Sequence, residues 1–309
     1  MRAIVYDPGA KHGLRLDDVA DPSPAPSEAL VRVTAVSLNW GELAHMAEQR
    51  APGEVPGWDA AGIVIAAAED GSGPPAGAEV VTFGWLGAWA ALRAVDTREL
   101  AVVPEGLPLA DAAALPVAGV TALRAVRALG PVLGRRVLVT GASGGVGRFA
   151  VQLAALAGAH VVAAVGRPER AKGLDALGAA EVVVGAEGGL GTLTEPVSAA
   201  IDNVGGALLA DVYRLAEPGG IVLSVGMASG QPTTIDFEHA RIHNGNARIQ
   251  AFNVGSRLGS DLAHLAALTA AGRLDPQVGW RGPWEDVADA ADALLGRRVL
   301  GKAVLEVGS

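Results

Sequence analysis

The chain has 309 residues, of which half are hydrophobic and 18% are charged, so we expect a folded globular protein rather than a disordered one. Its net charge of −9 argues against nonspecific binding to nucleic acid or to anionic membranes, and its lack of cysteine excludes disulfides, a thiolate nucleophile and a cysteine zinc site. The length favours two domains. No signal-peptide pattern or long apolar segment stands out, which predicts a soluble cytoplasmic protein.

The first third of the sequence, to about residue 112, is predicted to form a compact β-rich barrel. Residues 29–36 alternate apolar and polar side chains, as a half-exposed strand does. Further strand candidates are 1–6, 62–66 and 78–82. The alanine-rich segment 109–126 then favours helix, and we expect residues 116–119 to interrupt it and separate two helices.

From residue 135 to about 249, strands alternate with helical patterns, which is typical of a doubly wound parallel sheet. The predicted strands are 136–140, 160–165, 181–184, 198–202, 220–225 and 247–251. A last long helix is predicted at 257–272. Residues 301–307 alternate as a strand that could return to the first domain.

The segment 137–154 has the features of a dinucleotide-binding turn, in which a β-branched strand is followed by a glycine-rich turn and a helix. One stripe of that helix is apolar and suited to packing on a sheet, namely Phe149, Ala150, Leu153 and Ala154. Gly144 and Gly147 take the second and third glycine positions of the fingerprint, and Ala142 replaces the first. Such glycines let the pyrophosphate approach the backbone at a helix N-terminus. The alternative is a tight strand–helix turn without a ligand.

The cofactor preference follows from the charges after the strand 160–165. Gly166 and Arg167 end this strand and Arg170 follows, whereas Glu169 comes too late for the acid that binds the ribose hydroxyls of NAD. Two guanidinium groups match a 2′-phosphate, so NADPH is favoured over NADH. The alternative is that both arginines are solvated charges at a helix start.

Eight short motifs follow one another along the chain, at 37–39, 56–64, 115–122, 141–147, 177–179, 202–206, 219–226 and 301–305. In this order and spacing they resemble the medium-chain dehydrogenase/reductase superfamily, in its zinc-free quinone oxidoreductase and enoyl reductase branch. The resemblance implies an α/β fold with a GroES-like β-rich catalytic domain at 1–115 and 253–309. A Rossmann domain with a doubly wound parallel sheet is implied at 116–252, with the cofactor in the cleft between the two domains.

The resemblance also assigns residues to NADPH. Those implied to meet the pyrophosphate are Ser143, Gly144, Gly145 and Val146, and those implied to surround the adenosine phosphate are Gly166, Arg167 and Arg170. Those implied at the nicotinamide are Asn203, Val204, Gly226 and Met227, with Thr121 beneath the ring and Phe252 to Val254 closing over it. Asn39 is implied to lie near the nicotinamide and the substrate, and is our candidate catalytic residue.

Three departures from the family pattern bear on the chemistry. Zinc-dependent relatives use a cysteine near Asn39 and a Gly-His-Glu motif at 57–59, where this chain has Trp58 and no cysteine, so we expect no metal. The cysteine-rich structural zinc lobe is absent. A tyrosine common in NADPH-binding relatives is replaced near Gly185.

Other candidate residues have simpler interpretations. His239 and His243 are spaced for a helix and could bind a metal, but no third ligand is near, so we interpret them as a solvated face. Glu42 and His45 could relay a proton, although we favour polar residues at a helix start. The tyrosines, Tyr6 in a strand and Tyr213 in a helix, make a tyrosine proton donor improbable.

Tryptophan is unusually frequent, with six against four phenylalanines. By the resemblance, Trp40 and Trp58 flank the substrate pocket, where indoles would suit a flat, conjugated substrate. Trp85 and Trp89 either join them or fill the barrel core.

These observations predict a zinc-free, NADPH-dependent reductase that transfers hydride to a quinone or an α,β-unsaturated carbonyl, including an enone intermediate of natural-product synthesis. The acceptor would be polarised by hydrogen bonds, and a carbon-bound proton could come from water. The alternatives are a zinc-free alcohol or ketone reductase, or a non-catalytic NADPH-binding sensor or RNA-binding protein. Relatives imply a homodimer joined edge to edge through the strand 247–251 and the segment after it. We expect a flat or conjugated small-molecule substrate, and the net charge predicts no nucleic-acid or membrane partner.

Overall fold

The computed structural model describes residues 1–185, 190–191 and 193–308. Contacts within the chain divide it into two compact units. Unit 1 comprises Met1–Val120 and Gly255–Ser309, and unit 2 comprises Thr121–Val254. The division falls inside the helix α4 (Pro116–Ala128).

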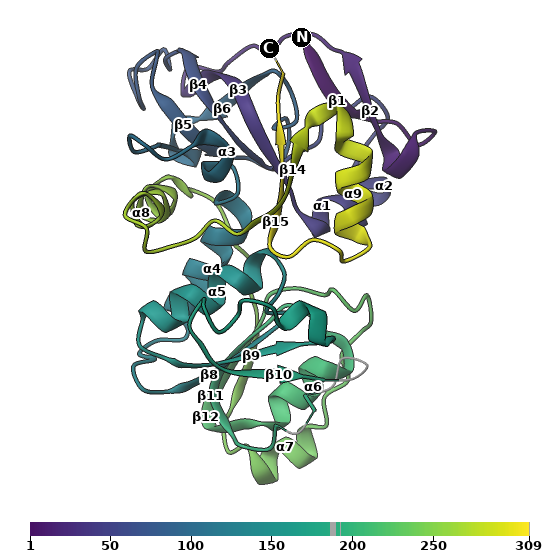
Figure 1. Cartoon of the computed structure of the whole chain (residues 1–309), viewed down its shortest axis with the longest axis vertical. Helices are drawn as coiled ribbons and strands as arrows, with labels where there is room; N and C mark the ends of the chain where they lie inside the picture. The colour runs from purple at the N-terminus through teal and green to yellow at the C-terminus, as the bar shows by residue number, and fades with distance from the viewer. Residues whose placement is uncertain (186–189, 192, 309) are drawn as a thin grey trace. The chain divides into compact units, whose positions relative to one another are not determined.

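Unit 1 is built on a seven-stranded sheet in the order β14-β15-β3-β4-β5-β7, with β6 also paired to β3, together with a β1–β2 hairpin (Figure 1). Its strands are β1 Arg2–Tyr6, β2 Leu14–Asp18, β3 Glu28–Leu38, β4 Asp59–Ala66, β5 Glu79–Phe83, β6 Leu92–Asp96, β7 Leu100–Val102, β14 Val278–Pro283 and β15 Lys302–Glu306. Its helices are α1 Trp40–Ala44, α2 Met46–Gln49, α3 Leu109–Ala112, α8 Gly259–Ala270 and α9 Val287–Leu295. The predicted alternation of β3 is confirmed, since Val31 and Val33 are buried and Arg32 between them is exposed.

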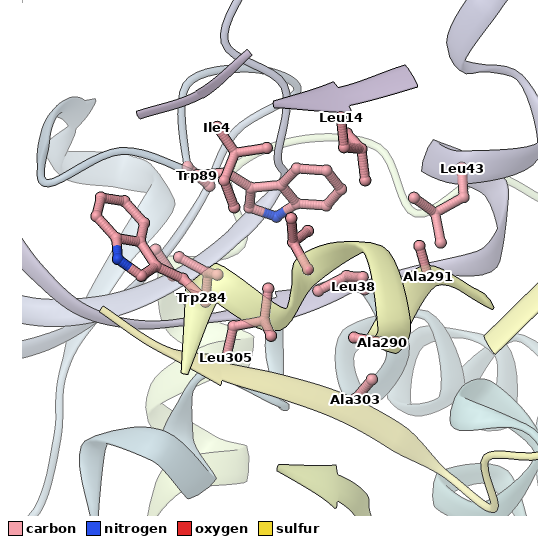
Figure 2. Close-up of a cluster of buried hydrophobic side chains, with 14 of the residues drawn as sticks. Ile4, Leu14, Leu38, Leu43, Trp89, Trp284, Ala290, Ala291, Ala303 and Leu305 are labelled. Atoms are coloured by element: carbon pink, nitrogen blue, oxygen red, sulfur yellow. The ribbon is translucent and has the colours of Figure 1, made fainter. Parts of the chain in front are cut away.

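The core of unit 1 lies under the helix α9. Figure 2 shows the Trp89 indole among side chains from several strands, with Ala290 and Ala291 of α9 facing the cluster. Trp89 is 0% exposed and its Nε1 donates to the Ser37 carbonyl at 3.2 Å. Trp89 and Trp284 are the largest side chains of this cluster, and small alanines on the helix allow close packing.

The strand register brings four strand ends to one end of the unit 1 sheet. Ser37 near the end of β3 lies opposite Asp59 at the start of β4, which in turn lies opposite Phe83 at the end of β5. On the other side of β3, Leu38 lies opposite Ala303, so Lys302 begins β15 at the same end. Residues distant in sequence therefore meet at this end.

Unit 2 is a six-stranded parallel sheet in the order β10-β9-β8-β11-β12-β13. Its strands are β8 Arg136–Thr140, β9 His160–Val165, β10 Ala179–Val184, β11 Val197–Asp202, β12 Ala216–Ser224 and β13 Arg248–Ala251, and its helices are α5 Gly145–Leu156, α6 Gly206–Arg214 and α7 Phe237–His243. Figure 1 shows α5 on one face of the sheet and α6 with α7 on the other. The predicted doubly wound sheet is confirmed, and β8 and β9 have the predicted bounds.

The predicted apolar stripe of α5 is confirmed, because all four of its side chains are buried, namely Phe149, Ala150, Leu153 and Ala154. The structure corrects two other helix predictions. The two predicted helices are confirmed as α3 and α4, but the break between them lies at residues 113–115. Residues 116–119 form the first turn of α4, since proline is tolerated where the backbone N–H would have no partner. The helix predicted at 257–272 is α8, but it is not the last helix, because α9 follows it.

Candidate active site

A cluster of buried charged side chains lies at the end of the unit 1 sheet where β4 and β15 begin. Lys302 Nζ is 3.2 Å from Asp59 Oδ2, and the two side chains are 2% and 0% exposed. The ammonium also donates to the Leu38 carbonyl at 3.1 Å and to Asn39 Oδ1 at 2.6 Å. Three acceptors therefore match the three ammonium hydrogens, which is the condition under which a buried charge is tolerated.

Asp59 receives three further hydrogen bonds. Its Oδ2 accepts from Ser37 Oγ at 2.9 Å and from Asn39 Nδ2 at 2.8 Å. Its Oδ1 accepts from the backbone N–H of Val117 at 3.1 Å, in the first turn of α4, where the helix dipole is positive. The cluster thus fixes the start of α4 to the end of the sheet.

Glu42 joins the cluster as part of a capping box at the start of α1. Its Oε2 accepts from the backbone N–H of Asn39 at 2.7 Å and from Asn39 Nδ2 at 2.9 Å, and its Oε1 accepts from the backbone N–H of Trp58 at 2.6 Å. Burial, and then the charge of Asp59, raise the pKa of Glu42 to about 8 against the opposing effect of these hydrogen bonds and of Lys302. Glu42 is therefore a helix cap, as favoured from the sequence, and also a buried group that titrates near neutral pH.

Asn39, the candidate catalytic residue, has its side-chain amide committed to this cluster. Its Nδ2 donates to Glu42 and Asp59, and its Oδ1 accepts from Lys302. These three bonds hold the amide of Asn39 in one orientation. His45, after α1, has its Nδ1 3.3 Å from Glu48 Oε2.

Aromatic side chains cover the region next to Glu42. The Trp58 ring meets Trp85 edge to face at 5.1 Å between centroids, and Phe83 meets Trp85 in the same way at 4.9 Å. Trp40 is half-buried and contacts His45 at 6.3 Å. The Nε1 of Trp58 is buried and has no hydrogen-bond partner in the described part of the chain. Of the two tryptophans left open by the sequence, Trp89 belongs to the core and Trp85, at 44% exposed, does not.

Arg93 holds the backbone on which these aromatic side chains stand. Its side chain is 2% exposed, and its Nη2 donates to the carbonyls of Trp58 and Gly84 at 3.2 Å and of Leu86 at 3.3 Å. Its Nη1 donates to Thr82 Oγ1 at 2.7 Å. Burial lowers the pKa of the guanidinium to about 10, against the attraction of nearby carboxylates.

In unit 2, the turn between β8 and α5 is rich in glycine and closely packed. Gly141 has φ +57°, so the tight turn is made one residue before Ala142. A Cβ on Gly147 would lie 2.3 Å from the Gly141 carbonyl oxygen, whereas a Cβ on Gly144 would make an ordinary contact at 3.5 Å. Gly147 is therefore required by close packing, whereas the surroundings of Gly144 have room for a Cβ.

The second predicted arginine lies against this turn. Arg170 belongs to the short 3-10 helix Pro168–Ala171 after β9, and its Nε donates to Ser143 Oγ at 2.6 Å. Arg167 precedes that helix and is exposed, as is Gly166. The structure therefore brings Arg170 and Ser143 together from two different strand ends.

A buried carboxylate organises the turn after β11. Thr140 Oγ1 donates to Asp202 Oδ1 at 2.5 Å, and Asp202 Oδ2 accepts from the backbone N–H of Val204 at 3.3 Å and of Gly205 at 2.7 Å. Burial raises the pKa of Asp202. The Asn203 side chain is held by a bond from its Nδ2 to the Thr140 carbonyl at 2.8 Å.

The remaining residues assigned to the cofactor follow other strands of the same sheet. Gly226 and Met227 follow β12 and Phe252 and Val254 follow β13, while Thr121 is buried in α4. A Cβ on Gly226 would lie 2.8 Å from the Asn203 carbonyl oxygen, so these two turns touch. Because the strands are parallel, their carboxyl ends share one edge of the sheet, where ligands of such folds bind.

Sequence reasoning did not identify several residues of the unit 1 cluster. Asp59 and Lys302 were noted only within motifs, and Ser37 and Arg93 were given no role. For Asp59, Arg93 and Lys302, the available signal was a charged residue next to a run of apolar residues, but exposed Arg32 has the same signal, so it does not separate buried from exposed charges. His239 and His243 lie on the exposed face of α7, as interpreted, with ring centroids 4.3 Å apart.

The described residues contain no group of three or more histidine, aspartate or glutamate side chains placed to hold a metal ion. None of their helices is both long enough and apolar enough to span a membrane.

Comparison with known proteins identifies both parts of the chain. Residues 25–105 match the family model of the alcohol dehydrogenase GroES-like domain, and residues 145–271 match that of the zinc-binding dehydrogenases. The chain is 39% identical over 203 residues to acrylyl-CoA reductase AcuI of Ruegeria pomeroyi and 38% identical over 203 residues to a chloroplast envelope quinone oxidoreductase homolog of Arabidopsis thaliana. Each match covers 59% of this chain, and they cover 59% and 60% of those relatives.

Solved structures agree with this assignment over the full length. An NAD-dependent alcohol dehydrogenase matches with a TM-score of 0.88 and 29% identity, covering 100% of both chains. The quinone oxidoreductase of Escherichia coli complexed with NADPH has the same fold, with a TM-score of 0.87 at 22% identity, covering 99% of this chain and 100% of that one. The predicted fold class, a GroES-like part and a Rossmann part, is confirmed, and the chain belongs to the medium-chain dehydrogenase/reductase superfamily.

Proposed function

We propose that this protein is a zinc-free, NADPH-dependent reductase of quinones or α,β-unsaturated carbonyl compounds. The observation that carries the proposal is the contact between Arg170 and Ser143, which places a guanidinium on the glycine-rich turn where an NAD-specific unit would have a carboxylate nearby. The reductase class is that of the relatives named above, and for this chain the activity, the cofactor and the acceptor are all proposed.

The residues of unit 2 fit a dinucleotide. The close contacts of Gly147 leave no room for a side chain inside the turn, and Gly144 leaves space for a pyrophosphate at the start of α5. Residues 143–146 would hold that pyrophosphate, Arg167 and Arg170 the 2′-phosphate, and Asn203 with Gly226 the nicotinamide ribose. Bound NADPH would supply the hydride.

The side chains of the unit 1 cluster would hold neighbouring groups in position and would not take part in the reaction themselves. Both N–H bonds of the Asn39 amide are used within the cluster, so we propose Asn39 as a positioning residue that fixes Lys302, Glu42 and the start of α1. Trp58 stands where zinc-dependent relatives have a histidine ligand, so we propose that no metal polarises the acceptor. Conjugated acceptors need less polarisation by the enzyme, because conjugation spreads the negative charge that hydride transfer creates. The proton added to carbon can come from water.

A zinc-free alcohol or ketone reductase is the second candidate. It is favoured by the full-length similarity to an NAD-dependent alcohol dehydrogenase. Oxidation of simple alcohols with NADP⁺ or NAD⁺ would support this candidate over the first.

We also propose a homodimer joined through the edge strand β13. This strand lies at one end of the sheet order, and three of its four side chains are exposed, those of Arg248, Gln250 and Ala251. An edge strand can pair with the same strand of a second copy. Sedimentation of the purified protein as a monomer would contradict this.

The deciding experiment measures consumption of NADPH and of NADH with phenanthrenequinone, cyclohexenone and a simple ketone as separate acceptors. Turnover of the quinone or the enone with a preference for NADPH supports the proposal. Turnover of the ketone alone supports the second candidate, and a preference for NADH contradicts the role given to Arg170.

A further inference from the structure

The loop between β5 and β6 presents two large apolar side chains to solvent. Trp85 is 44% exposed and Leu86 is 46% exposed. Burying a large aromatic side chain is favourable, so an indole left nearly half exposed beside two other aromatic rings is an unused contact surface. Trp85 meets Trp58 and Phe83 with interplanar angles of 82° and 79°, so both contacts are edge to face.

This loop is held rigidly despite its exposure. The buried guanidinium of Arg93 bonds the carbonyls on either side of Trp85, those of Gly84 and Leu86. Arg50 Nη2 donates to the carbonyl of Trp85 itself at 3.1 Å. A Cβ on Gly84 would lie 2.6 Å from Arg93 Nη2, so any side chain at this position would displace the guanidinium that bonds these carbonyls. The exposed ring is therefore already ordered, which lowers the entropic cost of binding a ligand.

Trp58 joins this surface to the buried cluster. Its backbone N–H is fixed by Glu42, and its backbone carbonyl by Arg93. Its Nε1 is buried and has no acceptor among the residues described, so this indole offers a bound molecule its ring and not its N–H group. The occupant that suits an exposed set of edge-to-face rings is a planar ring system.

We propose that Trp85, together with Trp58, forms the contact surface for a planar, fused-ring acceptor, and that Trp85 determines the preference for such acceptors over short unsaturated carbonyl compounds. This inference rests on the proposed reductase function and narrows its substrate class to polycyclic quinones and enones. Aromatic rings recognise one another through offset and edge-to-face packing, which a short acyl chain cannot provide.

The test compares the wild type, Trp85→Ala and Trp85→Phe, with Leu133→Ala as control because Leu133 is an 80% exposed apolar side chain in unit 2. KM and kcat are measured with saturating NADPH for phenanthrenequinone and for methyl vinyl ketone. We expect Trp85→Ala to raise KM for the quinone about tenfold with kcat within about twofold, and to leave KM for methyl vinyl ketone within about twofold. Trp85→Phe should keep most of the quinone affinity.

Equal changes for the two acceptors, or no change for the quinone, would overturn the inference while leaving the reductase function intact. Naphthol, a planar compound that the enzyme cannot reduce, separates the two failures. If the wild type reduces no acceptor, the proposed function fails, and calorimetry with naphthol still decides the inference. Weaker naphthol binding by Trp85→Ala, by about tenfold, supports the surface, and equal binding by the two proteins refutes it.

Discussion

Lys302 and Asp59 form an ion pair that is shut off from solvent, although 243 residues separate them in the sequence. Each charge is held by several further hydrogen bonds, so the pair is fully satisfied in the folded protein. Such a pair contributes less through its own attraction than through the penalty that follows when one partner is removed.

Lys302→Met should therefore destabilise the protein by about 3–5 kcal/mol, because it leaves the Asp59 carboxylate buried and unpaired. Urea unfolding measures the loss. The matched control is Lys11→Met, whose ion pair with Asp289 is exposed, and its cost should be below about 1 kcal/mol. The double variant with Asp59→Asn should recover part of the loss, and strictly additive effects would show that the two charges are not coupled.

The stability of the protein should fall as pH rises between 4.5 and about 8, because the folded-state pKa of Glu42 is raised across that range. The folded protein binds the proton more tightly than the unfolded chain does. The contribution is fully present below 4.5 and is lost as the pH approaches 8, with a slope from this group of up to about 1.4 kcal/mol per pH unit.

Glu42→Gln should remove this slope, even if the amide changes the absolute stability by placing a donor against the backbone N–H of Asn39 or Trp58. Glu48→Gln is the control, since the Glu48 side chain is 78% exposed. Free energies of unfolding measured at several pH values decide the matter. Parallel curves for the wild type and Glu42→Gln would refute the role of Glu42.

Two glycines of the cofactor turn should respond differently to alanine. Gly147→Ala places a methyl group 2.3 Å from a backbone oxygen, so we expect a loss of stability of more than about 2 kcal/mol. Gly144→Ala meets no close atom and should change stability by less than about 1 kcal/mol, yet weaken NADPH binding, because its methyl group would occupy the space proposed for the pyrophosphate. Thermal unfolding and fluorescence titration with NADPH measure the two effects. Unchanged affinity in Gly144→Ala would move the proposed pyrophosphate site elsewhere.

Arg170→Ala should raise KM for NADPH about tenfold or more and leave KM for NADH nearly unchanged, since charge-assisted bonds to a phosphate are lost only with the phosphorylated cofactor. Arg241→Ala serves as control, because its ion pair with Glu238 on α7 is exposed. Steady-state kinetics with both cofactors measures the effect. An equal change in both KM values would show that Arg170 acts through the shape of the turn rather than through the 2′-phosphate.

Local patterns were sufficient to predict most of unit 2. The parallel strands are runs of apolar residues between helices, and the turn at Gly144 and Gly147 has a recognisable spacing, so β8, β9 and α5 could be located from sequence. The stripe Val287, Ala290 and Ala291 of α9 also has helical spacing, and the helix was missed because alanine-rich segments look alike throughout this chain.

The parts that could not be predicted depend on pairing between distant segments. β14 contains two glycines and a proline, and it is a strand because β15 pairs with it. The cluster around Asp59 requires the registers of β3, β4 and β15, which no local pattern specifies. Trp85 and Trp89 have the same side chain, and only the course of the loop decides that one is exposed and the other is core.

The position of Lys302 in the last strand of the chain has a consequence for the timing of synthesis. Unit 2 is continuous in sequence, so all of its described strands have left the ribosome before β15 is made. Until then, the buried carboxylate of Asp59 lacks the ammonium of Lys302, and residues 35–38 of β3 lack the strand that pairs with them. During synthesis, unit 2 can therefore complete its described sheet while the sheet of unit 1 still lacks a strand, so the two units finish folding at different times.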